Sequence, residues 1–130
     1  MLYSILCYHS EKAVGAWTPA QDAATMEKLA VVQQKLVQQG KLGPVVRLMP
    51  TTTATTLRKE HSPPLLVDGP FAETKEQLLG FYVVNCDSRD EVHEIARELA
   101  AANPGGAYEI RPVAVMNLQG DGTVSAARHE

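Results

Sequence analysis

The groups most capable of chemistry gather in residues 67–80, where three carboxylates, a lysine and a hydroxyl fall within nine positions. Ionisable side chains packed densely beside apolar strands can have shifted pKa values, as in many catalytic sites. Asp68 precedes Gly69-Pro70, so its carboxylate either faces a cleft as a general acid or base or accepts backbone amides within the turn. The other charged members, which either bind a ligand or form a solvated turn, are Glu73, Lys75 and Glu76.

Two arginines could recognise an anionic ligand. A guanidinium offers planar, bidentate hydrogen bonding to a carboxylate or phosphate, so Arg58 and Arg111 are predicted ligand-binding residues. The alternative is an internal ion pair with Glu73, Glu76 or Glu109, which would hold the acidic turn against the sheet.

Histidine is the side chain best suited to proton transfer at neutral pH, and His9 is the candidate here. His9 follows the first predicted strand and could approach Asp68 across the sheet edge to form an acid/base pair. The alternative is a solvated loop histidine. His93 and His129 are expected at the surface.

Metal and cofactor sites are not predicted. Cys7 and Cys86 lack the close spacing of a zinc or redox motif, and each closes a predicted strand, so both are interpreted as small buried side chains. No His-x-x-x-His pair or glycine-rich phosphate loop occurs in the sequence.

Length and charge narrow the class of protein. A chain of 130 residues has the usual size of one domain. Its net charge of −3 and lack of a basic cluster argue against binding to nucleic acid or an anionic membrane. Since the sequence shows no signal-peptide pattern and no transmembrane stretch, a cytoplasmic location is expected.

Two helices are predicted from their caps and apolar stripes. Thr18, Pro19 and Gln21 have the arrangement of a capping box, which predicts a helix over residues 19–39. Ser88 and Glu91 repeat this arrangement before a second apolar stripe that ends at the Pro and Gly cluster of residues 103–106. Strands are predicted at residues 2–8, 45–48, 51–57, 65–67, 79–86 and 107–116.

This order of elements matches the split βαβ arrangement of a ferredoxin-like α+β fold, βαββαβ, with an antiparallel sheet. The two runs around Met49-Pro50 are expected to form a protruding hairpin, residues 9–17 a loop, and residues 73–77 one helical turn. The domain is expected to span residues 1–116, followed by a flexible tail over residues 117–130.

Both faces of the predicted sheet are apolar, and this predicts a homodimer. Side chains alternate along a strand, so Phe81 and Val83 face away from Tyr82 and Val84, yet all are apolar. Two helices cover one face only, and the sheet of a second copy would cover the other. The alternative cover is the hairpin near Thr51 together with the tail.

Residues 68–78, DGPFAETKEQL, closely resemble the signature of the DGPF group of YCII-related proteins. The resemblance extends to residues 54–58 and 109–113 and covers most of residues 1–116. It implies a ferredoxin-like domain that forms a dimeric α/β barrel, with a proposed enzymatic role. Some YCII-related proteins resemble acid/base enzymes with a histidine early in the first helix, but this chain has no histidine between Thr18 and Gly40.

Two functions remain open at this level. The first is a small-molecule enzyme that uses Asp68 as a general acid or base in an inter-sheet pocket, where Arg58, Lys75 or Arg111 orients an anionic substrate. The second is a non-catalytic ligand-binding or transcription-associated regulatory module, because members of the DGPF group are sometimes linked with sigma factors.

Overall fold

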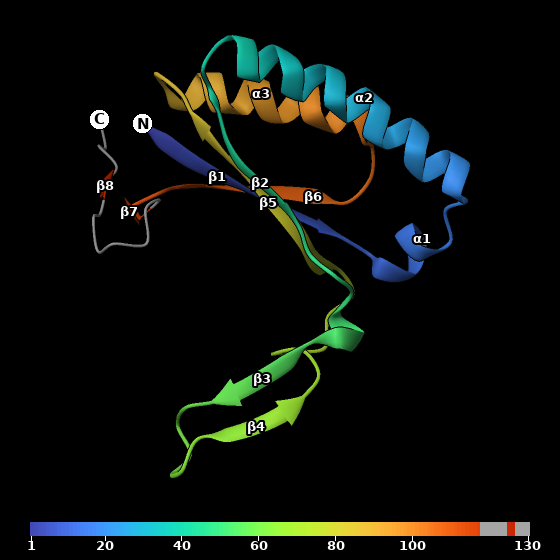
Figure 1. Ribbon diagram of the computed structural model, residues 1–130, viewed down its shortest axis with the longest axis vertical. Helices are drawn as coiled ribbons and strands as arrows, with labels where there is room; N and C mark the ends of the chain where they lie inside the picture. Colours follow the sequence, from blue (N-terminus) through green and yellow to red (C-terminus); the bar gives the residue numbers. More distant parts are fainter. Residues whose placement is uncertain (118–124, 127–130) are drawn as a thin grey trace.

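The computed structural model describes residues 1–117 and 125–126. Its centre is a four-stranded antiparallel sheet in the order β2-β5-β1-β6 (Figure 1). The strands of this sheet are β1 (Leu2–His9), β2 (Leu42–Arg47), β5 (Gln77–Asn85) and β6 (Ala107–Pro112). Strand order and connections are consistent with the predicted ferredoxin-like fold.

The two long helices, α2 (Pro19–Gln38) and α3 (Arg89–Ala102), lie on the same side of this sheet (Figure 1). The predicted capping box of α2 is present: Thr18 Oγ1 accepts from the Gln21 amide at 3.1 Å, and Gln21 Oε1 accepts from the Thr18 amide at 2.9 Å. Only half of the predicted box forms at α3. Ser88 Oγ accepts from the Glu91 amide at 3.2 Å, but the Glu91 carboxylate pairs with Lys41 at 2.8 Å.

The core lies between these helices and the sheet. Helix α3 contributes a strongly amphipathic stripe, because Val92, Ile95 and Leu99 recur at three- and four-residue spacing. The sheet contributes the alternate side chains that face the helices. The other members of this buried cluster are Tyr3, Ile5, Leu29, Leu36, Tyr82, Val84, Cys86 and Ala96.

The opposite face of the sheet also carries apolar side chains. Leu6 of β1 lies opposite Phe81 of β5 on one side and Glu109 of β6 on the other, and both Leu6 and Phe81 are half-buried. Arg111 lies on this face as well, opposite Ser4. A single chain does not test whether a second copy covers this face, so the homodimer stays a prediction.

The protruding hairpin exists, but its predicted arms were wrong. It consists of β3 (Thr55–Arg58) and β4 (Leu65–Asp68), which project from the end of the sheet (Figure 1). Residues 45–48 were assigned to this hairpin, whereas β2 pairs with β5 in the main sheet. The reason is Pro50 and the 3-10 turn η1 (Thr51–Thr53), which separate β2 from β3 and redirect the chain.

Three further local predictions differ from the structure. The expected loop at residues 9–17 contains α1 (Glu11–Gly15), which is capped by Ser10. The expected helical turn at residues 73–77 is irregular, and the Thr74 hydroxyl donates to the Glu76 carbonyl there. The last predicted strand ends at Pro112, which lacks an amide donor, and β7 (Val115–Met116) instead pairs with β8 (Ser125–Ala126). The rest of the predicted tail lies outside the described residues.

Candidate functional site

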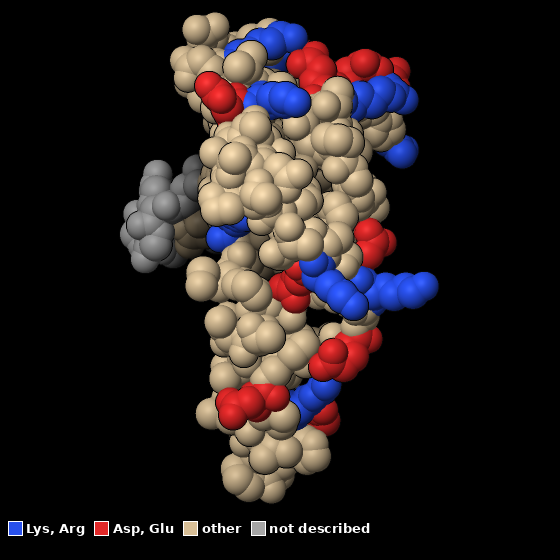
Figure 2. All heavy atoms as spheres, turned by 90° about the vertical axis from the view of Figure 1, so that its right-hand side faces the viewer, with Lys and Arg blue, Asp and Glu red and all other residues tan. Residues whose placement is uncertain are grey.

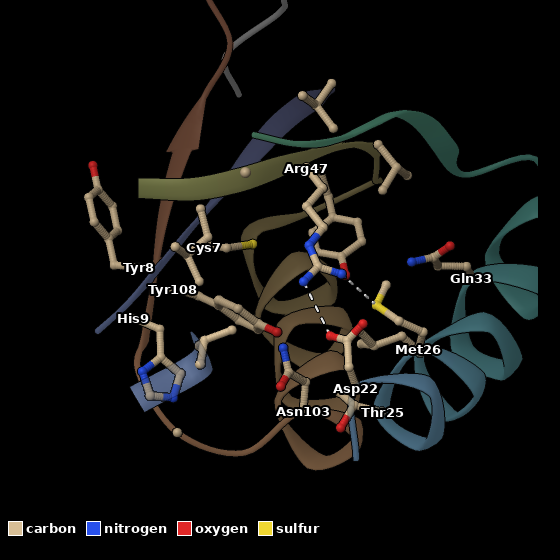
Figure 3. A pocket seen from close by; sticks show the side chains of 18 of the residues that line it. Cys7, Tyr8, His9, Asp22, Thr25, Met26, Gln33, Arg47, Asn103 and Tyr108 are labelled. Carbon is tan, nitrogen blue, oxygen red and sulfur yellow. Dashed lines mark hydrogen bonds and ion pairs between the residues drawn. The ribbon is translucent and has the colours of Figure 1, made fainter. Parts of the chain in front are cut away.

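A pocket of about 120 Å³ lies between α2 and the helix-facing side of the sheet (Figure 3). It forms where β1 ends and α1 leads the chain into α2, so that side chains from the sheet, from both of these helices and from the loop after α3 converge. Its wall is mainly apolar, as in most small-molecule sites. The apolar lining includes Val14, Met26, Leu29, Val45, Leu79 and Tyr82.

An ion pair spans one side of the pocket. Arg47, the last residue of β2, places Nη2 3.2 Å from Oδ1 of Asp22, and Nη1 lies 3.6 Å from the sulfur of Met26 (Figure 3). Asp22 lies in the first turn of α2, where the helix dipole favours a negative charge. The two side chains are 58% and 39% exposed, so solvent reaches the pair.

His9 lies at the rim and has a defined orientation. Its Nδ1 accepts a hydrogen bond from the Ser10 amide at 2.8 Å, so the proton of the neutral ring is on Nε2. Trp17 contacts the ring edge-on, with centroids 6.3 Å apart and an interplanar angle of 86°. An imidazole held in this way has no free lone pair on Nδ1.

Two glycines in the loop between α3 and β6 allow the backbone to close on His9. Gly105 has φ of +98°, and a Cβ atom there would lie 2.7 Å from His9 Nε2. Gly106 has φ of +74°, and a Cβ atom there would lie 2.2 Å from the Tyr8 carbonyl oxygen. Both φ values are in the region that favours glycine, and a Cβ atom would also collide with its neighbours. Both positions therefore require glycine.

The floor of the pocket contains a tyrosine and an asparagine with poorly satisfied polar atoms. The Tyr108 hydroxyl points toward Asn103 (Figure 3). Neither this hydroxyl nor Asn103 Oδ1 forms a hydrogen bond of good geometry, although both are shielded from solvent. Burial raises the pKa of Tyr108, and the neighbouring Asn103 side chain opposes this rise only in part.

Cys7 also lines the pocket, and its thiol is protonated at neutral pH. Burial raises the pKa of Cys7 to about 11, and the same cause raises that of Cys86 to about 11. The thiolate is the reactive form of cysteine. Cys7 therefore contributes to the pocket as a small apolar group rather than as a nucleophile.

Of the predicted site residues, His9 lines this pocket and the others do not. Asp68 ends β4 opposite Thr55 and is exposed on the hairpin. Arg111 lies on the opposite face of the sheet. The predicted charged residues of the segment between β4 and β5 are also exposed: Glu73, Lys75 and Glu76.

Arg58 has a structural contact within the DGPF segment. Its Nη2 donates to the Phe71 carbonyl at 2.9 Å, and its guanidinium lies 4.9 Å from the centre of the Phe71 ring. The Gly69 amide donates to the Ala54 carbonyl at 2.8 Å, and the Thr56 hydroxyl donates to the Gly69 carbonyl at 2.9 Å. The conspicuous motif thus packs against β3 in a single chain, whatever further role it has.

Sequence reasoning missed Asp22, Arg47, Asn103 and Tyr108. Arg47 and Asp22 are 25 positions apart and belong to no motif. A weak signal existed, because the capping box at Thr18 places Asp22 in the first helical turn. The pairing itself depends on how β2 crosses beneath α2, which local patterns do not specify.

Within residues 1–117 and 125–126, no group of three or more histidine, cysteine, aspartate or glutamate side chains is placed to hold a metal ion. The helices in this part of the chain are also too short or too polar to cross a membrane.

Comparison with known proteins places the chain in a family. Residues 1–117 match the YCII-related domain. An uncharacterized protein of Rhizobium meliloti (strain 1021) is 53% identical over 116 residues, which cover 88% of this chain and 94% of that protein. The match spans the sheet, both long helices and the hairpin, so the chain belongs to the YCII-related family.

Proposed function

We propose that this chain binds a small organic molecule in the pocket between α2 and the sheet, with His9 at its rim. The observation that carries the proposal is the pocket itself, with an apolar wall and a few polar groups that come from separate elements. A volume of about 120 Å³ suits a compact ligand.

The contacts of His9 argue against a role as a general base. A general base would need a lone pair on Nε2, which requires a proton on Nδ1. The Ser10 amide already donates to Nδ1 at 2.8 Å, so this tautomer would bring two donors together. Nε2 itself faces the Gly105 backbone, where a Cβ atom would lie 2.7 Å away, so His9 shapes the rim of the pocket.

Blocking the pocket tests the proposal. Val45 lines the pocket from an edge strand and is 43% exposed, so Val45→Trp should fill the space without disturbing the buried cluster. Fragment binding to the wild-type protein, monitored by amide chemical shifts, should be lost in Val45→Trp. Val31→Trp is the matched control, because Val31 is 71% exposed on α2 and does not line the pocket. Equal binding to the blocked variant, or no binding to the wild type, would contradict the proposal.

The hairpin favours a second candidate site. Its strands expose Leu57, Leu65, Leu66 and Val67, and Phe71 beside them is 74% exposed. An isolated two-stranded hairpin is marginally stable in water, so apolar side chains of this kind need a partner surface. Figure 2 shows the tip of the hairpin as a largely uncharged surface that projects from the body.

We propose that a second copy of the chain packs on the hairpin and on the open sheet face, and that Asp68 acts as an acid or base in the inter-sheet pocket of that dimer. Arg58, Lys75 and Arg111 would then orient an anionic ligand. Asp68→Asn should abolish turnover at this site while His9→Phe leaves it unchanged. Ligand binding that depends on Asp68 without turnover would indicate a binding or regulatory module instead.

A further inference from the structure

We infer that the ligand of the helix–sheet pocket is a small monocarboxylate with one aromatic ring or a short apolar body, and that Arg47 binds the carboxylate in competition with Asp22. The inference rests on the proposed function, since it names the chemical class of the ligand for the same pocket.

The pocket has few charged side chains, and its arginine is only partly hydrogen-bonded. Among the residues that line it, Arg47 carries the one permanent positive charge and Asp22 the one carboxylate. They share a single contact, Nη2 to Oδ1 at 3.2 Å. The neighbouring Nη1 faces the sulfur of Met26 at 3.6 Å, and a thioether is a weak acceptor.

A guanidinium can form more hydrogen bonds than Arg47 forms with Asp22. It has five N–H donors in a fixed fork and binds a carboxylate most strongly through two parallel hydrogen bonds. The contact with Asp22 satisfies one of these donors with good geometry. A ligand carboxylate could therefore form a more complete interaction than the internal one.

Opening the internal pair should cost little. Arg47 and Asp22 are 58% and 39% exposed, and ion pairs at such solvent exposure contribute little to stability. Asp22 would remain stabilised in the first turn of α2, because the helix amide dipoles favour a negative charge there. The same dipoles favour a ligand anion beside Arg47 and disfavour a ligand cation.

The apolar side chains of the pocket determine the size and polarity of the ligand body that fits. Leu29, Val45, Leu79 and Tyr82 present apolar surface around a volume of about 120 Å³. A cavity of roughly 150 Å³ lined by apolar side chains holds one benzene ring. An apolar body no larger than a single ring, with one carboxylate at the Arg47 side, fits both size and charge.

Matched pairs of acids and amides test this inference on the full-length chain. Benzoate with benzamide, and phenylacetate with phenylacetamide, differ in charge and hardly in shape. We expect each acid to bind about tenfold more tightly than its amide, as for a charge-assisted hydrogen bond, when affinities are measured by calorimetry. Arg47→Gln should abolish this preference, and Asp22→Asn should increase the affinity for the acids because it frees the guanidinium.

The control is Glu98→Gln, which removes the exposed pair between Lys35 and Glu98 at 3.1 Å outside the pocket and should change neither affinity. Equal binding of acids and amides would overturn the inference and leave the proposed function standing. A preference for acids that survives Arg47→Gln would also overturn it. If no fragment of any charge binds in the pocket, both the inference and the proposed function fail.

Discussion

At the scale of single residues, the pocket depends on side chains whose neighbours restrict them. His9 is fixed by the Ser10 amide, by Trp17 and by the backbone of Gly105. Its orientation is therefore a property of three segments rather than of β1 alone. This explains why a histidine that the sequence presents as a loop residue contributes to a defined site.

Gly105→Ala should displace His9. The variant combines a strained φ of +98° with a Cβ atom 2.7 Å from Nε2, and such backbone strain costs on the order of 1–3 kcal/mol. We expect lower stability in urea and changed imidazole nitrogen chemical shifts. Gly15→Ala is the control, because a Cβ atom at Gly15 meets no atom within 4 Å. An unchanged His9 spectrum in Gly105→Ala would contradict the packing described here.

The two cysteines predict a loss of stability at alkaline pH. Burial raises the pKa of both Cys7 and Cys86 from 9.0 to about 11, so the folded state keeps protons that the unfolded chain releases. The free energy of unfolding should be unaffected by these thiols below about pH 9 and fall as the pH rises to about 11. Urea titrations across this range check it. Cys7→Ala should show a smaller decrease, and an equally steep decrease would assign the effect to other groups.

At the scale of elements, predictions succeeded where the signal is local. The helix at residues 19–39 was predicted from Thr18, Pro19 and Gln21, and α2 spans Pro19–Gln38. The central strands were predicted from their continuous apolar runs. The hairpin arms were wrong because pairing partners depend on contacts across the sheet: β2 pairs with β5, and β3 pairs with β4.

The capping box of α2 provides a quantitative check. Thr18→Ala removes the acceptor for the Gln21 amide and should lower the free energy of unfolding by about 1 kcal/mol, measured by urea denaturation. The exposed Thr52, which follows the start of η1, offers a control, since Thr52→Ala should change stability by less than about 0.5 kcal/mol. Equal effects of the two substitutions would show that the cap contributes little.

The candidate site was predicted less completely than the fold. The density of charge at residues 67–80 drew attention to Asp68, but density along the chain does not imply convergence in space. The structure instead brings together Asp22, Arg47 and His9 from three elements with no shared motif. Of these, His9 alone was predicted, because a histidine at a strand end is noticeable without knowledge of its neighbours.

At the scale of the whole molecule, the apolar hairpin and the open sheet face lead to the proposed homodimer. Leu66 is 70% exposed and pairs with Leu57, which is 51% exposed. Leu66→Glu should therefore weaken self-association, measured by sedimentation equilibrium, by well over tenfold, because it places a charge in an apolar contact. Val31→Glu on α2 should leave association unchanged. A wild-type chain that stays monomeric at high concentration would contradict the dimer.

One candidate site lies on the helix-facing side of the sheet and the other on its open face and the hairpin. The position of a bound ligand therefore distinguishes the two sites. The most direct measurement is a set of intermolecular nuclear Overhauser effects between benzoate and the methyl groups of the protein. We expect contacts with methyl groups of Met26, Leu29 and Val45, which line the helix–sheet pocket. Contacts with Leu57 and Leu66 of the hairpin instead would contradict it.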